Sequence, residues 1–142
     1  MLGPPGPSVH SHAVKPVVVA ILLVLLVASC GKGSVRLYTA AATKACLEKA
    51  GFRPRPVPTT ADFVANSATG GAFRVALPGN SVTVSFGETL TDADNIDDAY
   101  HRFRAKNVGI EDILRRNQNA IMLWRVHPQD ADLATITNCL KS

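Results

Sequence analysis

The residues best suited to chemistry in this sequence are four aspartates and a histidine that lie close together: Asp92, Asp94, Asp97, Asp98 and His101. On a helix, residues four positions apart lie one turn apart, so Asp94 would face Asp98 and Asp97 would face His101. Carboxylate oxygens and an imidazole nitrogen are common ligands of metal ions. We therefore treat Asp94, Asp97, Asp98 and His101 as weak candidates for a metal site.

The spacing of these residues does not match a calcium-binding loop. Such a loop would need an oxygen ligand where Ile96 stands, a glycine where Asp97 stands and a glutamate where Phe103 stands. Acidic residues in the first turn of a helix are also stabilised by the helix dipole. A helix capped by Thr91, with Asp94 as its capping-box partner, explains the same residues without a ligand. This solvated, capped helix is the favoured interpretation, and no cofactor is predicted.

Catalytic motifs are otherwise absent from the sequence. Beyond the first 29 residues the histidines are His101 and His127, and no G-x-S-x-G turn accompanies either of them. The sequence contains no G-x-G-x-x-G, no Walker-type loop and no H-E-x-x-H. A small ligand-binding or enzymatic domain that uses the helix over residues 92–101 is therefore an alternative hypothesis, and a non-enzymatic role is favoured.

A further reactive group is the thiol of Cys30, which follows an apolar run over residues 17–28. As a helix this run would be about 18 Å long, short of the roughly 30 Å of a bilayer core. The preceding Lys15 and the small residues Ala28 and Ser29 at its end are typical of a cleaved signal segment. An uncleaved membrane anchor and a buried core helix are the alternatives.

The motif formed by Val27, Ala28, Ser29 and Cys30 resembles the lipobox of bacterial lipoprotein precursors. The resemblance implies that a diacylglyceryl group, with fatty acids such as palmitate, is attached to the Cys30 thiol and that the chain is cut just before it. The implied organisation is a signal peptide over 1–29, a lipidated N-terminus with a flexible tether over 30–36, and a single domain over 37–142. That domain would lie on the extracytoplasmic face of the cell membrane, held there by the N-terminal lipid.

The three cysteines of the chain leave one without a partner in an exported protein, unless one has another role. If Cys30 carries lipid, Cys46 and Cys139 remain, and an oxidising compartment allows them to form a disulfide. Two buried free thiols are the alternative. Neither cysteine has a C-x-x-C neighbour, so redox catalysis and zinc binding are not predicted. If they pair, the first and last helices of the domain lie side by side.

Apolar periodicity and turn residues predict seven elements. They are a helix over 39–50, an edge strand over 52–57, a short helix from Thr60, a hairpin of 73–77 and 82–86, a helix from Thr91, a strand over 120–126 and a helix over 130–140. Residues 110–116 are expected to add a turn or two of helix. In the hairpin, the large apolar residues alternate with Arg74, Ala76, Thr83 and Ser85, which we expect on a solvated face.

This order predicts an α+β fold, in which a small, mostly antiparallel sheet of three or four strands has helices packed on one face, as in a ferredoxin-like sandwich. A lipobox, a short helix bearing Cys46 and Leu47, a central hairpin and a terminal Cys139 and Leu140 also resemble small exported proteins of high-GC Gram-positive bacteria. That second resemblance implies no functional residues.

The basic residues of the chain occur in pairs, such as Arg53 with Arg55 and Arg115 with Arg116, and the formal net charge is +4. Such pairs are either ordinary solvated charge or a preference for anionic headgroups. The charge is mild and the hairpin has no aromatic residues on its polar face for base stacking, so no nucleic-acid partner is predicted. We expect a binding or structural module of the cell envelope, whose partner is another envelope protein, a cell-wall component or the membrane surface.

Overall fold

The structure is a computed structural model that describes Gly3 and residues 35–104 and 109–142. The chain divides into two units, Met1–Val35 and Arg36–Ser142, and the second contains all of the described helices and strands. Cys30, the motif that resembles a lipobox and, apart from Gly3, the expected signal peptide lie outside the described residues. Within the described ranges, no helix has the length and apolar character needed to cross a membrane.

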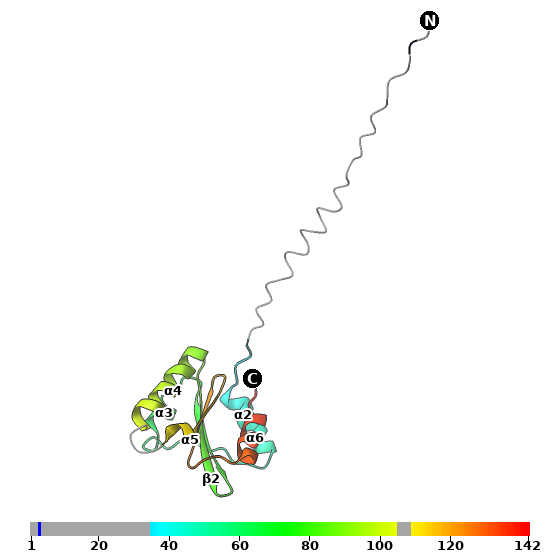
Figure 1. Ribbon diagram of the computed structural model, residues 1–142. Helices are drawn as coiled ribbons and strands as arrows, with labels where there is room; N and C mark the ends of the chain where they lie inside the picture. Colours follow the sequence, from blue (N-terminus) through cyan, green and yellow to red (C-terminus); the bar gives the residue numbers. More distant parts are fainter. Residues whose placement is uncertain (1–2, 4–34, 105–108) are drawn as a thin grey trace. The chain divides into compact units, whose positions relative to one another are not determined.

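Four antiparallel strands form the sheet of the second unit, in the order β1-β2-β4-β3 (Figure 1). They are β1 (Ala72–Leu77), β2 (Asn80–Phe86), β3 (Leu114–Asn117) and β4 (Ala120–Trp124). β1 and β2 form the expected hairpin, with Leu77 opposite Asn80 and a turn of Pro78 and Gly79 between them. Gly79 has a φ of 75°, which a glycine after a proline adopts without strain. β4 lies inside the sheet, as its apolar sequence predicts.

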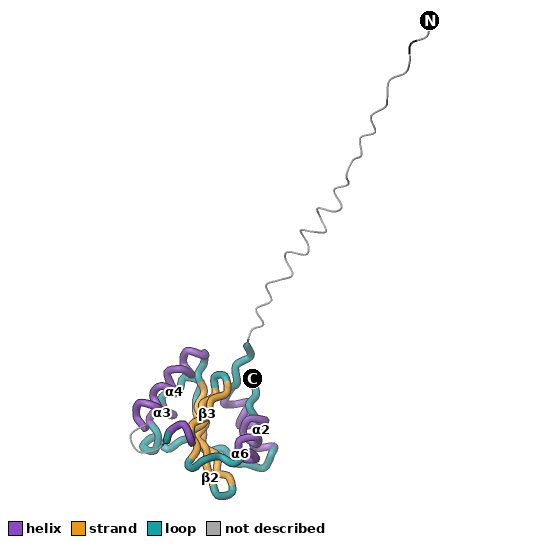
Figure 2. Tube along the Cα trace, in the orientation of Figure 1, coloured by secondary structure: helices purple, strands orange, loops and turns teal. Residues whose placement is uncertain are grey.

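Helices cover both faces of this sheet. They are α2 (Ala40–Lys49), α3 (Phe63–Asn66), α4 (Leu90–Arg104), α5 (Ile110–Ile113) and α6 (Asp130–Asn138). Figures 1 and 2 show α2 and α6 on one side of the strands, and α3, α4 and α5 on the other. The predicted α+β fold with an antiparallel sheet is confirmed. The helices form two layers, however, so the expected one-sided, ferredoxin-like sandwich is replaced by three layers.

The side chains of β4 explain why helices pack on both faces of the sheet. Ala120, Met122 and Trp124 belong to the cluster under α2 and α6, whereas Ile121 and Leu123 belong to the cluster under α3, α4 and α5. All five residues of the strand are buried. Because successive side chains of a strand point to opposite faces, a strand that is apolar at every position requires a layer on each side.

The hairpin has the buried apolar face that its alternation predicts, formed by Phe73, Val75, Leu77, Val82, Val84 and Phe86. Its other face departs from the prediction. Thr83 and Ser85, expected in solvent, are buried beneath the second helix layer, and the Ser85 hydroxyl lies 3.4 Å from the Tyr100 hydroxyl of α4. Only Arg74 and Ala76, at the edge strand, are exposed on that face as expected.

Two local predictions need correction. Residues 110–116 do not form one helix, because α5 ends at Ile113 and the chain continues directly into β3, an edge strand paired with β4. The cap of α4 lies two residues earlier than expected. The Thr89 hydroxyl accepts from the backbone N–H of Asp92 at 3.0 Å, and the Asp92 carboxylate accepts from the backbone N–H of Thr89 at 3.0 Å. The capping box is therefore Thr89 with Asp92, rather than Thr91 with Asp94.

A disulfide joins Cys46 near the end of α2 to Cys139 at the end of α6, with 5.3 Å between their Cα atoms. The predicted pairing of these two cysteines is confirmed, and so is the side-by-side placement of the first and last helices. α2 follows Thr39, whose hydroxyl caps it by accepting from the N–H of Ala42 at 3.2 Å. The bridge spans 93 positions of sequence and so ties together the two ends of the described domain.

Gly87, at the end of β2, is a position where only glycine fits. A Cβ atom built there would lie 2.5 Å from the backbone nitrogen of Ala93 and 2.6 Å from the carbonyl oxygen of Thr89. Because both contacts are with backbone at the start of α4, Gly87→Ala must displace the helix and should lower the free energy of unfolding by about 2–3 kcal/mol. Urea unfolding measures this. Gly109→Ala is the control, because a Cβ there meets nothing within 4 Å, and equal losses for both variants would contradict the expected contact.

Candidate functional site

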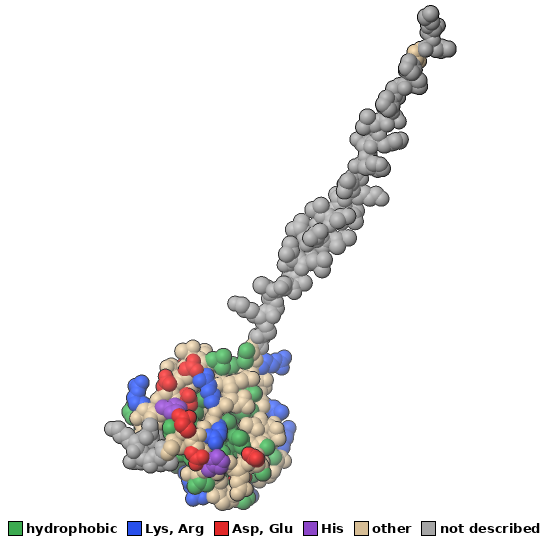
Figure 3. Space-filling view, viewed as in Figure 1, with side chains coloured by type: hydrophobic (Ala, Val, Ile, Leu, Met, Phe, Trp, Pro, Cys, Tyr) green, Lys and Arg blue, Asp and Glu red, His purple; other side chains and the backbone are tan. Residues whose placement is uncertain are grey.

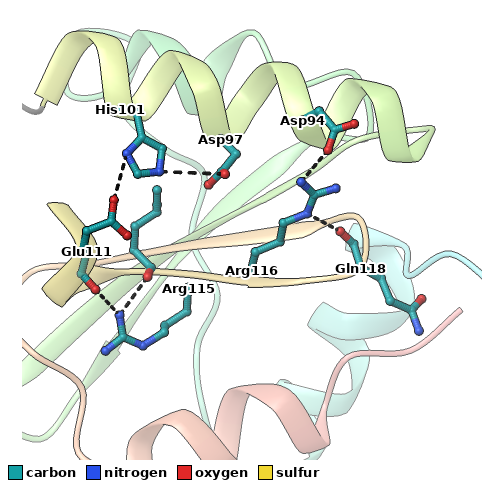
Figure 4. A network of polar contacts seen from close by, with 8 residues as sticks. Asp94, Asp97, His101, Glu111, Arg115, Arg116 and Gln118 are labelled. Carbon is teal, nitrogen blue, oxygen red and sulfur yellow. Dashed lines mark hydrogen bonds and ion pairs between the residues drawn. The ribbon is translucent and has the colours of Figure 1, made fainter.

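The acidic helix considered as a metal site is α4, and its carboxylates point to different partners (Figure 4). Asp94 forms an ion pair with Arg116 of β3. The Arg116 Nε atom also donates to the carbonyl oxygen of Gln118 at 3.0 Å. Arg116 thus connects α4 to the β3–β4 turn, so Asp94 has a structural partner that a bound cation would have to replace.

Asp97 and His101 face each other one turn apart on α4, as the sequence predicts, with 3.9 Å between His101 Nε2 and the Asp97 carboxylate. The other ring nitrogen of His101 lies 3.4 Å from the carboxylate of Glu111 on α5. Asp97, His101 and Glu111 therefore form a polar contact between the two helices, visible in Figure 4. Over the described ranges, no group of three or more His, Cys, Asp or Glu side chains is arranged to hold a metal ion.

His127 also has a carboxylate partner, since its Nδ1 atom lies 2.6 Å from Asp112 Oδ1. Both side chains are more than half exposed, at 62% and 60%. A general base normally works beside a cleft that excludes water from the reacting group. Neither His127 nor His101 is among the residues that line the two clefts described below. Figure 3 shows that acidic, basic and histidine side chains alternate over this face, which is typical of a solvated surface.

A buried carboxylate links α3 to α4 within the second helix layer. Asp62, only 7% exposed, caps α3 by accepting from the N–H of Ala65 at 3.1 Å. Its other oxygen accepts from the Tyr100 hydroxyl at 3.1 Å. These contacts orient α3 against α4, and the sequence did not single out either residue for this role.

The domain holds its own N-terminal segment firmly. The side-chain amide of Asn119, which is 1% exposed, donates to the carbonyl oxygens of Tyr38 at 2.9 Å and Gly87 at 2.7 Å. Its carbonyl oxygen accepts from the backbone N–H of Tyr38 at 2.8 Å. The N–H of Thr39 donates to the carbonyl of Lys141 at 2.7 Å. These contacts fix residues 38 and 39 to the domain, and in the sequence these two residues follow the expected tether over 30–36.

A large cleft lies at the edge of the sheet opposite β3. It has a volume of about 680 Å³ and lies between residues 51–58 and the β1 edge of the hairpin. Arg53, Arg55 and Arg74 line it, and no Asp or Glu is among its described lining residues. A smaller cavity of about 180 Å³ shares Arg74 and Ser81 with it. This volume is in the range of small-molecule sites, so the cleft is the strongest binding candidate among the described residues.

Trp124, the single tryptophan, is 1% exposed and packs in the cluster under α2 and α6. It is a core residue, as predicted, and its ring offers no surface on which a ligand could stack.

The chain matches no family model, no curated protein and no solved structure.

Proposed function

We propose that this protein is a lipid-anchored, extracytoplasmic module of the bacterial cell envelope, tethered at Cys30, whose disulfide-bonded domain acts by binding rather than by catalysis. The disulfide between Cys46 and Cys139 carries the proposal. Disulfides persist in oxidising compartments outside the cytoplasm. The bridge accounts for two of the chain's three cysteines, and the third is Cys30 of the lipobox motif.

The attachment of the N-terminal segment supports the same proposal. If a domain is attached to a membrane through its N-terminus, the first residues of the domain must be held firmly by the rest of it, so that they do not detach. Tyr38 has this character, because the buried Asn119 side chain holds both its N–H and its carbonyl group. The disulfide then ties α2, which follows Tyr38, to the last helix.

A binding role is favoured over the enzymatic alternative on α4. His101 contacts Asp97 and Glu111, and Asp94 faces Arg116. Over the described ranges, no three of these side chains are arranged to hold a metal ion. The cleft of about 680 Å³, in contrast, is lined by three arginines, Ser81 and apolar residues, and no Asp, Glu or His is among its described lining residues. Envelope ligands and partner proteins are therefore the expected targets.

The Cys30→Ser variant tests the anchor. In cells that export and acylate lipoproteins, the unaltered protein should incorporate labelled palmitate and lack residues 1–29. Cys30→Ser should incorporate no label and keep the precursor length, because the acyl acceptor is the thiol. Metabolic labelling followed by gel analysis and mass spectrometry measures both properties.

The matched control is the double variant Cys46→Ser/Cys139→Ser, which removes two cysteines of the disulfide and retains Cys30. It should keep the label. Label on the Cys30→Ser chain, or a wild-type protein of precursor length without label, would contradict the proposed anchor. The second of these outcomes would support an uncleaved membrane segment.

A further inference from the structure

We infer that the cleft lined by Arg53, Arg55 and Arg74 is a binding site for a phosphate-bearing ligand. The first observation is the position of two of the arginines. Arg55 and Arg74 form an isolated antiparallel bridge, in which each backbone N–H donates to the other residue's carbonyl oxygen at 2.8 Å. Residues directly opposite each other in such a pair place their side chains on the same face, and like charges there repel.

The second observation is that the arginines of this cleft lack an ion-pair partner among the described residues. Within the part of the chain that the structure describes, no ion pair involves Arg53, Arg55 or Arg74. Arg116, on the other edge of the sheet, is paired with Asp94. Asp62 lines the adjoining cavity with Arg74, but its carboxylate accepts from Ala65 and Tyr100. Arg55 and Arg74 therefore have no ion-pair partner among the described residues, and an anion in the cleft would relieve their repulsion.

One of the guanidinium groups is already oriented. Arg74 Nη2 donates to the Ser81 hydroxyl at 3.0 Å, which fixes a side chain that would otherwise sample many rotamers. Guanidinium groups bind phosphate oxygens through two parallel N–H donors, and an oriented group loses less entropy when it does so. Three such groups suit a multiply charged phosphate better than a single carboxylate.

The backbone of the cleft also leaves donors available. The ladder that pairs Arg55 with Arg74 would next pair Arg53 with Ala76, but no backbone hydrogen bond joins those two residues. Alternation along an antiparallel strand directs the Ala76 N–H and carbonyl to the same edge as those of Arg74. Ala76 lines the cleft, so its N–H adds a neutral donor to the three cationic groups.

The remaining walls suggest an organic phosphate. Phe52, Pro56 and Pro58 line the same cleft and supply apolar surface next to the arginines. The phosphate could belong to a lipid headgroup or to a soluble phosphate ester, and this inference does not depend on the anchor at Cys30.

Calorimetric titration of the purified full chain with pyrophosphate and with glycerol phosphate, at constant ionic strength, tests the site. We expect saturable binding that weakens at least about tenfold in the triple variant Arg53→Gln/Arg55→Gln/Arg74→Gln, because charge-assisted hydrogen bonds are lost. Arg36→Gln/Lys44→Gln/Arg102→Gln is the matched control, since it removes the same charge elsewhere without breaking a described ion pair and should bind like the unaltered protein. Absence of saturable binding, or equal weakening in both triple variants, would overturn the inference.

Two further measurements keep the test decisive. If the cleft triple variant unfolds, the single variants Arg53→Gln and Arg74→Gln replace it. In the unaltered protein, the amide NMR signal of Ala76 should shift when the phosphates are added.

Vesicles of phosphatidylglycerol and of phosphatidylcholine identify the source of the phosphate. Arginine-dependent binding to the first kind of vesicle supports a lipid headgroup, whereas binding to the soluble phosphates alone supports a soluble ester. Binding to none of these probes overturns the site.

Discussion

The double variant Cys46→Ala/Cys139→Ala should lose about 4–5 kcal/mol of unfolding free energy, because the bridge closes a loop of 93 positions and restricts the unfolded chain. Cys139 is buried and Cys46 half-buried, so the alanines also remove some packing beneath α2 and α6. A small domain has a total stability of about 5–15 kcal/mol, and a loss of this size leaves little in reserve.

Urea unfolding followed by circular dichroism measures this loss. Reducing the unaltered protein with dithiothreitol should reproduce the midpoint of the double variant, because both lack the same cross-link. Cys30→Ala is the matched control and should unfold at the wild-type urea concentration. A double variant within 1 kcal/mol of the unaltered protein would contradict a stabilising role for the bridge.

Asn119→Ala should destabilise the domain by roughly 3–4 kcal/mol, since three hydrogen bonds are lost at a buried site. The Asn119 side chain is 1% exposed and bonds both peptide groups of Tyr38 and the carbonyl of Gly87. After truncation these backbone groups have no partner, and water must enter or the segment must detach. Hydrogen exchange at the Tyr38 amide should accelerate along with the loss of stability.

Asn117→Ala provides a neighbouring control in the same turn region. Asn117 is half-buried and accepts one hydrogen bond of 3.3 Å, from the Tyr38 hydroxyl, so its loss should cost less than about 1 kcal/mol. Asn119→Asp should be at least as harmful as Asn119→Ala, because it loses both donors and places a carboxylate beside two carbonyl oxygens. Similar stabilities for the Asn117 and Asn119 variants would contradict the proposed attachment of the N-terminal segment.

The elements with strong periodic patterns could be predicted from the sequence. The hairpin, the interior position of β4 and the first and last helices all follow from alternation, apolar spacing and caps. β3 could not be predicted, because its four residues have no apolar alternation. Its pairing with β4 depends on the turn at Gln118 and Asn119, which joins the two strands. The apolar residues of β4 occupy both faces of the strand and so indicate a second helix layer. The prediction nevertheless placed helices on only one face of the sheet.

The candidate sites differ in how far local sequence defines them. The disulfide followed from counting cysteines, and the contact of Asp97 with His101 followed from helical spacing. The arginine cleft did not, because Arg53 and Arg55 were visible as a pair whereas Arg74 joins them through an isolated bridge between distant segments. The role of Asn119 depends on contacts with Tyr38, 81 positions away, which no local pattern contains.

The intact mass of the native protein from the membrane fraction, measured with and without reduction, tests the central claim most directly. The proposal predicts a chain that begins at Cys30, carries the mass of acyl groups, and gains the mass of two hydrogens on reduction as the bridge between Cys46 and Cys139 opens. A chain that retains residues 1–29 and carries no acyl mass would contradict the lipid anchor and the localisation inferred from it.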